Sequence, residues 1–242
     1  MADQAIVRAV VGLRGYGKST KVTALAKDFP RVFYFDTLGD DYTDGIIVRD
    51  RRTLERFWRG VYRLPFRIVY RPSDPVAEFP RICELIWECG NLLFVVDEVQ
   101  MYSHGPWSVP AFTKIITGGR HAGLDLVGVT QAPKKLGELL RSQAHEWFVF
   151  GVREPDQAHY LSERLAGVPD DVFRMLEKYH YVHYVDGADE CWICKDVPAT
   201  GGTDKLVSVL RDAKALISGP ASDSGEHADA GGPLERGPAD RA

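Results

Sequence analysis

The stretch GLRGYGKST at residues 12–20 decides the fold class of this chain. Its nine residues are Gly12, Leu13, Arg14, Gly15, Tyr16, Gly17, Lys18, Ser19 and Thr20. The β-branched run before it (5–11) predicts a strand, and the apolar residues at helical spacing after it (21–27) predict a helix. A strand, a glycine-rich turn and a helix, in this order, are the context in which the pattern GxxxxGK[ST] binds phosphate. The stretch therefore predicts an α/β protein with a nucleotide site.

Each part of this stretch has a chemical role in the predicted site. The glycines let the backbone curl so that its N–H groups point inward, toward phosphate oxygens. The N-terminus of the following helix adds partial positive charge behind them. Lys18 is expected to reach the β- and γ-phosphates, and the hydroxyl of Ser19 to ligate Mg²⁺. The predicted cofactors are thus ATP and Mg²⁺, with Gly12–Thr20 as the nucleotide-binding loop.

A second motif follows the uninterrupted apolar run Leu92–Val96. Such a run is typical of a strand that is buried on both faces, as in a parallel sheet. It ends in Asp97 and Glu98, at the edge where parallel strands carry their ligands. Asp97 is predicted to help hold Mg²⁺, and Glu98 to orient and activate the attacking water. At least one strand–helix unit separates the two motifs, so we expect another strand between theirs in the sheet.

A third buried strand is predicted over Leu124–Gln131, and Gln131 ends it. At the same edge of the sheet as Asp97, this side chain is placed to sense the γ-phosphate by a hydrogen bond. Taken alone, a glutamine at the end of a strand is more often a solvated loop residue. Its expected position beside the carboxylate strand favours the catalytic role.

The remaining sequence alternates between strand and helix patterns. Strands are predicted at 31–36, 45–49, 66–71 and 146–152, and helices at 52–59, 80–89, 107–117, 136–142, 154–165, 169–178 and 203–217. The runs 179–185 and 190–195 flank the turn DGAD and predict an antiparallel hairpin added to the sheet. The predicted fold is a P-loop NTPase of the ASCE type, a three-layer sandwich around a mostly parallel sheet. One domain is expected over residues 1–218, followed by a disordered tail over 219–242, where large apolar residues are rare.

Composition sets limits on the class of protein. The chain has 242 residues, of which 45% are hydrophobic and 26% charged, as in ordinary soluble proteins. Its net charge of −4 gives no overall basic field that would indicate nucleic acid. No apolar run approaches the roughly 18 residues of a membrane span, and we expect no secretory signal. The four cysteines then indicate a reducing compartment, and the zinc-like pair Cys191 and Cys194 is expected to be core thiols, because residues three apart in a strand face opposite sides.

The three motifs together resemble the FtsK/HerA superfamily of P-loop ATPases, which move DNA. The resemblance rests on the loop Gly12–Thr20, the strand end VVDE at 95–98, and the block 118–133, which holds an arginine-bearing turn, a strand and the sequence QAP. The small size is similar to the genome-packaging ATPases of tailless viruses with an internal membrane. Zot-like phage assembly proteins share the core but usually carry a membrane segment. The resemblance implies an ATP-hydrolysing motor that packages a genome by moving double-stranded DNA through a ring of subunits, expected to be a hexamer.

In a ring of subunits, Arg120 is expected to act in the active site of a neighbour. It lies in a Gly-Gly-Arg turn that can reach out from one subunit, and phosphoryl transfer commonly uses an added arginine. Arg153 is the competing candidate, and a plain surface arginine is the alternative. A portal or membrane-vertex protein is an expected partner, in the host cytoplasm or on the virion. The alternatives are virion assembly or export of the Zot kind, or an ATPase that switches a protein partner without moving DNA.

Overall fold

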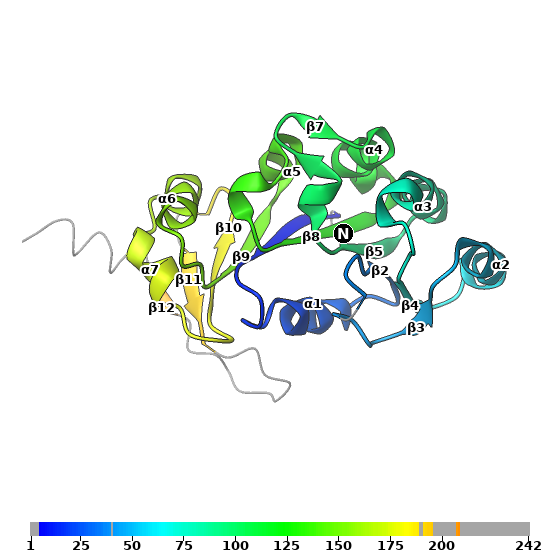
Figure 1. Cartoon of the computed structure of the whole chain (residues 1–242), viewed down its shortest axis with the longest axis horizontal. Helices are drawn as coiled ribbons and strands as arrows, with labels where there is room; N and C mark the ends of the chain where they lie inside the picture. Colours follow the sequence, from blue (N-terminus) through cyan, green and yellow to red (C-terminus); the bar gives the residue numbers. More distant parts are fainter. Residues whose placement is uncertain (1–4, 40, 189–190, 196–206, 209–242) are drawn as a thin grey trace, which may run out of the picture.

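The computed structural model describes residues 5–39, 41–188, 191–195 and 207–208. Within these residues one large sheet forms the centre of the molecule (Figure 1). Its strands are β1 (Val7–Val11), β2 (Arg31–Phe35), β3 (Ile46–Val48), β4 (Phe66–Tyr70), β5 (Leu92–Val96), β8 (Leu124–Thr130), β9 (Glu146–Phe150), β10 (Tyr181–Val185), β11 (Cys191–Cys194) and β12 (Val207–Ser208). Their order is β12-β11-β10-β9-β1-β8-β5-β2-β4-β3.

The order of the strands confirms the predicted α/β class. From β9 to β3 every neighbouring pair is parallel, whereas β10, β11 and β12 pair in antiparallel fashion. The predicted hairpin is therefore present as β10 and β11. β8 lies between β1 and β5, so the expected strand does separate the phosphate-loop strand from the carboxylate strand. Parallel strands place their carboxyl ends at one edge, which brings the loops after β1, β5 and β8 together.

Helices cover both faces of the sheet, which makes three layers (Figure 1). The helices are α1 (Lys18–Ala26), α2 (Arg51–Val61), α3 (Pro75–Cys89), α4 (Pro110–Gly118), α5 (Glu138–Gln143), α6 (Pro155–Arg164) and α7 (Asp170–Met175). Short 3₁₀ turns occupy η1 (Val99–Met101), η2 (Gly119–Ala122) and η3 (Pro133–Lys135). In the view of Figure 1, α1 lies below the sheet and α3, α4 and α5 lie above it.

Side chains that alternate along the strands form two separate cores. Val22 and Ala26 of α1 pack with Val95 of β5 and Val127 of β8 on one face. The other face is larger and contains Phe94 of β5 among many buried residues from α2 to α7. Because β5 is buried on both faces, its five residues are all apolar, as the sequence pattern predicted.

Three of the predicted helices were partly wrong. Residues 107–108 do not begin a helix but form β7 (Trp107–Ser108), which pairs with β6 (Ser103–His104) across a Gly-Pro turn, so α4 starts only at Pro110. α3 starts at Pro75, not at residue 80, because Asp74 caps it by accepting the N–H of Ala77 at 3.1 Å.

The third correction concerns the predicted helix 203–217. Residues 207–208 form β12 and pair with β11. The rest of that helix and the predicted tail 219–242 lie outside the described residues. Among the residues that the structure does describe, none of the helices combines the length and the apolar character that a membrane span needs.

Candidate nucleotide site

The loop between β1 and α1 forms one wall of a pocket of about 250 Å³. Gly12 has a φ of 134°, and a Cβ on it would lie 2.7 Å from Phe150 Cβ, so only glycine fits against β9. The N–H of Leu13 donates to the carbonyl of Gly151 at 3.0 Å, which fastens the loop to the same strand end. The stretch that the sequence predicts as the phosphate loop therefore lies between β1 and the N-terminus of α1, as the strand and helix patterns around it predicted.

Lys18 lies in this pocket, and 9% of the residue is exposed. Its Nζ donates a hydrogen bond of 3.0 Å to the carbonyl of Leu13. Burial lowers the pKa of the ammonium group, although the charges of Asp97 and Glu98 act in the opposite direction. A desolvated cation at the mouth of a phosphate loop is suited to bind an anion that replaces its lost hydration.

The carboxylate of Asp97 is buried beside the loop. The residue is 4% exposed, and Oδ2 accepts no hydrogen bond from the described residues. Burial, followed by the charges of Asp41 and Glu98, raises its pKa to about 8. A buried acceptor oxygen without a donor, close to other acids, suits a bound cation better than it suits an isolated side chain.

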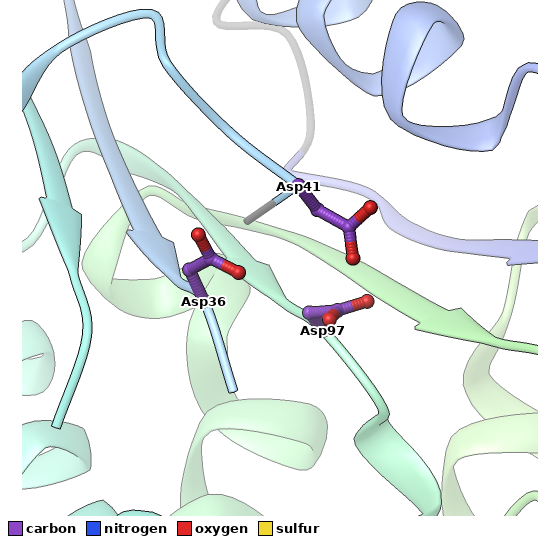
Figure 2. Close-up of side chains that lie close together, drawn as sticks. All are labelled: Asp36, Asp41 and Asp97. Atoms are coloured by element: carbon purple, nitrogen blue, oxygen red, sulfur yellow. The ribbon is translucent and has the colours of Figure 1, made fainter. Parts of the chain in front are cut away.

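Asp97 belongs to a group of three acids whose oxygens lie within 4.8 Å of one another. Figure 2 shows Asp36 after β2, Asp97 after β5, and Asp41 from the loop beyond β2, with their side chains gathered in one place. Arg71 compensates Asp36 by an ion pair of 2.8 Å. Asp41 remains exposed and accepts a hydrogen bond of 3.3 Å from the hydroxyl of Ser19.

This donor set fits Mg²⁺, which prefers oxygen ligands. The predicted pair Ser19 and Asp97 lies at the same end of the pocket, with Asp41 beside both. Asp41 was not predicted from the sequence. It stands in a polar turn whose residues all look like solvated loop residues, and no regular spacing relates it to the other motifs.

Glu98 has an unusual backbone and two amide partners. Its φ of 47° and ψ of 46° are in the left-handed region, which is uncommon for a residue other than glycine. Gln131 Nε2 donates to Glu98 Oε1 at 2.6 Å, and Gln100 Nε2 donates to Oε2. The sequence predicted Gln131 at this edge but not Gln100, which follows Glu98 by two residues and carries no recognisable signal.

The two candidate arginines lie at opposite edges of the sheet. Arg120 precedes β8, so it is at the amino end of the parallel strands, away from the phosphate loop. Within one subunit it cannot reach the nucleotide, and a role in a neighbour's site stays a prediction. Arg153 follows β9 at the carboxyl edge, and its guanidinium donates to the hydroxyl of Tyr16 at 3.3 Å.

Comparison with known proteins gives relatives for this arrangement. No family model matches the sequence. A curated protein, the DNA packaging ATPase P9 of Enterobacteria phage PRD1, is 26% identical over 203 residues, which cover 78% of this chain and 86% of that protein. The likeness thus includes most of both chains.

Solved structures share the fold. The genome packaging NTPase B204 from Sulfolobus turreted icosahedral virus 2, in complex with sulfate, has a TM-score of 0.66 and 20% identity, covering 81% of this chain and 98% of that one. Its complex with ATPγS has the same TM-score at 18% identity, covering 81% and 100%. The bacterial conjugative coupling protein TrwBΔN70 has a TM-score of 0.56 and 13% identity, covering 84% and 87%. This chain is thus similar in sequence to a viral DNA packaging ATPase, and it shares its fold with the packaging NTPase B204 and with TrwBΔN70.

Proposed function

We propose that this protein is a Mg²⁺-dependent ATPase that moves double-stranded DNA during viral genome packaging. The observation that carries the proposal is the convergence of the phosphate loop, Asp97, Glu98 and Gln131 on one pocket. The likeness to the PRD1 DNA packaging ATPase P9 supports the same activity. We further propose a ring of identical subunits, expected to be a hexamer, that works in the host cytoplasm with a portal or membrane-vertex protein.

The phosphate loop binds the triphosphate in this proposal. Backbone N–H groups at the start of α1 and the ammonium group of Lys18 offset the negative charge of the β- and γ-phosphates. Ser19 and Asp97 would hold Mg²⁺, which supplies further positive charge to the phosphate oxygens when it is bound. The buried position of Asp97 keeps its carboxylate away from competing water.

Glu98 then acts on the attacking water. Its carboxylate accepts a proton from that water, which is general base catalysis. The water oxygen bonds to the γ-phosphorus as the bond from that phosphorus to the β–γ bridging oxygen breaks, and ADP and phosphate leave. Gln131 and Gln100 hold both carboxylate oxygens and so fix the direction in which the group points. The strained backbone of Glu98 costs of order 1–3 kcal/mol, and strain of this kind is concentrated at functional sites.

Translocation is tested most sharply by displacement of a labelled third strand from a DNA triplex. The purified ring should displace the strand only with hydrolysable ATP, and Glu98→Gln should bind ATP without displacing it. An active ATPase that never displaces the strand, and whose rate ignores DNA, would instead favour the switching of a protein partner.

A further inference from the structure

α2 and its flanking residues are strongly basic. Six arginines and two acids lie between Arg49 and Arg63, in a chain of net charge −4. Arg52, Arg56 and Arg59 are spaced by four and three residues, so they lie on one face of the helix, and Arg63 follows two residues after Val61, the last residue of α2. We call these four residues the arginine stripe.

The face of α2 opposite the stripe is buried. Leu54 and Trp58 belong to the core, and the ring centroid of Trp58 lies 5.7 Å from that of Phe33 in β2. All four stripe arginines are exposed. Since the apolar side of the helix is already covered, α2 has no free apolar face to insert into a lipid surface.

The acids on and beside α2 have hydrogen-bond or ion-pair partners outside the stripe. Among the described residues, no ion pair includes any of its four arginines. Glu55, the acid within the helix, lies 3.8 Å from Arg51 and 3.7 Å from Arg81. Asp50 caps the helix by accepting the N–H of Thr53 at 2.8 Å. Three like charges therefore stand along about 11 Å of helix, with the fourth just beyond its end, and a polyanion would relieve their repulsion.

We propose that the arginine stripe binds the phosphate backbone of duplex DNA. This inference rests on the proposed function and assigns the surface that contacts the DNA. About 11 Å of B-DNA carries roughly six phosphates on its two strands, so along the helix the phosphates outnumber the stripe arginines. Contacts to the backbone are independent of sequence, as a protein that passes a whole genome requires. In Figure 1, α2 lies at the end of the molecule beyond β3 and β4, well away from α1 and the phosphate loop.

The salt dependence of DNA binding tests this surface. We would measure duplex binding by fluorescence anisotropy with ATPγS between about 50 and 200 mM salt, for wild type and for Arg52→Gln/Arg56→Gln/Arg59→Gln. The slope of log affinity against log salt should fall by about one for each arginine removed. The matched control removes three exposed cations from separate elements: Lys27→Gln/Lys114→Gln/Arg174→Gln. It should keep the slope of the wild type.

Three results would overturn the inference. One is a stripe variant that folds and binds DNA with the slope of the wild type. Another is a control variant that loses as much slope, because bulk charge would then explain both. The third is a stripe variant that keeps the DNA slope but no longer forms rings, which would assign the stripe to contacts between subunits. Wild-type protein that hydrolyses ATP but binds no duplex is a different failure, which counts against the proposed function itself.

A separate observation concerns the pocket. Tyr179 lines it and is 47% exposed. Its φ of 67° is uncommon for an aromatic residue, and its N–H donates to the carbonyl of Tyr16 at 2.9 Å. A Cβ on Gly17 would lie 2.7 Å from Tyr179 Cδ1, so the ring rests against the phosphate loop. The backbone thus holds an exposed ring at the edge of the nucleotide pocket.

The sheet order places this ring at the end of the pocket away from the carboxylates. Tyr179 precedes β10, on one side of β1, whereas Asp97 and Glu98 follow β5 on the other side. A nucleoside triphosphate whose γ-phosphate lies at Glu98 has its nucleobase at the other end of the pocket, away from Glu98. We infer that the ring of Tyr179 stacks on the nucleobase. This inference also rests on the proposed function and names the contact for the base.

Comparison of ATP with inorganic tripolyphosphate tests the stacking, because only ATP carries a base. Tyr179→Asn tolerates the positive φ but removes the ring. It should lose at least about fivefold in affinity for ATP and keep its affinity for tripolyphosphate, whereas Tyr179→Phe should bind both like wild type. Trp107→Ala removes an equally exposed aromatic residue elsewhere and serves as the control.

Two results would contradict the stacking. In the first, Tyr179→Asn binds ATP with the affinity of wild type. In the second, it loses affinity for ATP and for tripolyphosphate equally, which would mean that the ring only supports the loop. If wild type binds neither compound, the nucleotide site itself is wrong.

Discussion

The side-chain amide of Gln131 donates a hydrogen bond of 2.6 Å to the carboxylate of Glu98. It joins the end of β8 to the end of β5, two strands that are neighbours in the sheet. The residue expected to sense the γ-phosphate therefore also holds the residue expected to activate water. A shift of either strand end would change the direction in which the carboxylate of Glu98 points.

This contact predicts graded effects on hydrolysis. Glu98→Gln should bind ATP normally but lose roughly 10²–10⁴-fold in turnover, because the shape is kept and the base is not. Gln131→Ala should lose less, since Gln100 still holds the other carboxylate oxygen. Single-turnover hydrolysis with a nucleotide-binding control measures both. Equal turnover in Glu98→Gln and wild type would refute the role of Glu98.

Lys18 should contribute to nucleotide binding and not to the stability of the protein without nucleotide. Burial lowers the pKa of its ammonium group, so the empty protein gains little from a charge there. Lys18→Met should therefore unfold at a temperature no lower than wild type, while the stabilisation by added ATP disappears. Thermal unfolding with and without ATP reads out both quantities. A variant that unfolds earlier when empty would show that Lys18 is structural.

His183 predicts how stability depends on pH. Its ring stacks on Phe148 with centroids 4.6 Å apart. Burial lowers the pKa of His183; the charge of Glu146 acts to raise this pKa, and the charges of Lys21 and Arg8 lower it further. The unfolded chain therefore binds the proton of this histidine more tightly than the folded protein does. The stability that neutral His183 contributes is fully present above the ordinary histidine pKa of about 6.5 and is lost as pH falls below it.

The matched comparison is His183→Gln. Urea unfolding at successive pH values should show a smaller loss of free energy of unfolding below pH about 6.5 in this variant than in wild type. Identical pH profiles for the two proteins would remove His183 as the cause.

Arg120 should act, if the ring forms as proposed, on the nucleotide of the neighbouring subunit. Its place at the amino edge of β8 excludes a role in its own site. Mixing inactive Arg120→Ala with inactive Lys18→Ala should restore some hydrolysis, because certain interfaces pair an intact loop with an intact arginine. Full activity of Arg120→Ala alone, or no recovery in rings shown to exchange subunits, would reject the assignment.

The sequence was most informative where one local pattern determines both structure and chemistry. The phosphate loop and the run Leu92–Val96 carry their own context, so it could be predicted that another strand separates their strands in the sheet. Asp41 and Tyr179 come from irregular segments, and only the folded chain brings them to the pocket. Neither the polar turn around Asp41 nor the turn that holds Tyr179 has a spacing that relates it to the loop.

Two other features had local signals of different strength. The Gly-Pro pair at 105–106 marks the turn of the small hairpin, but the apolar residues after it favoured a longer helix. The arginine stripe is visible as a row at helical spacing, yet the net charge of the whole chain conceals it, because acids elsewhere cancel it in the sum. Within the part of the chain that the structure describes, Arg52, Arg56 and Arg59 are exposed and form no ion pair, and only the fold reveals this.

The rate of ATP hydrolysis with and without duplex DNA tests the central claim most directly. The measurement uses the assembled full-length protein with Mg²⁺ and ATP, and Glu98→Gln as the blank for contaminating activity. The account predicts that duplex DNA raises the rate, and that added salt abolishes the increase steeply because phosphate contacts release counterions. A nucleotide-competent ring whose rate is the same with and without DNA at every salt concentration would contradict it.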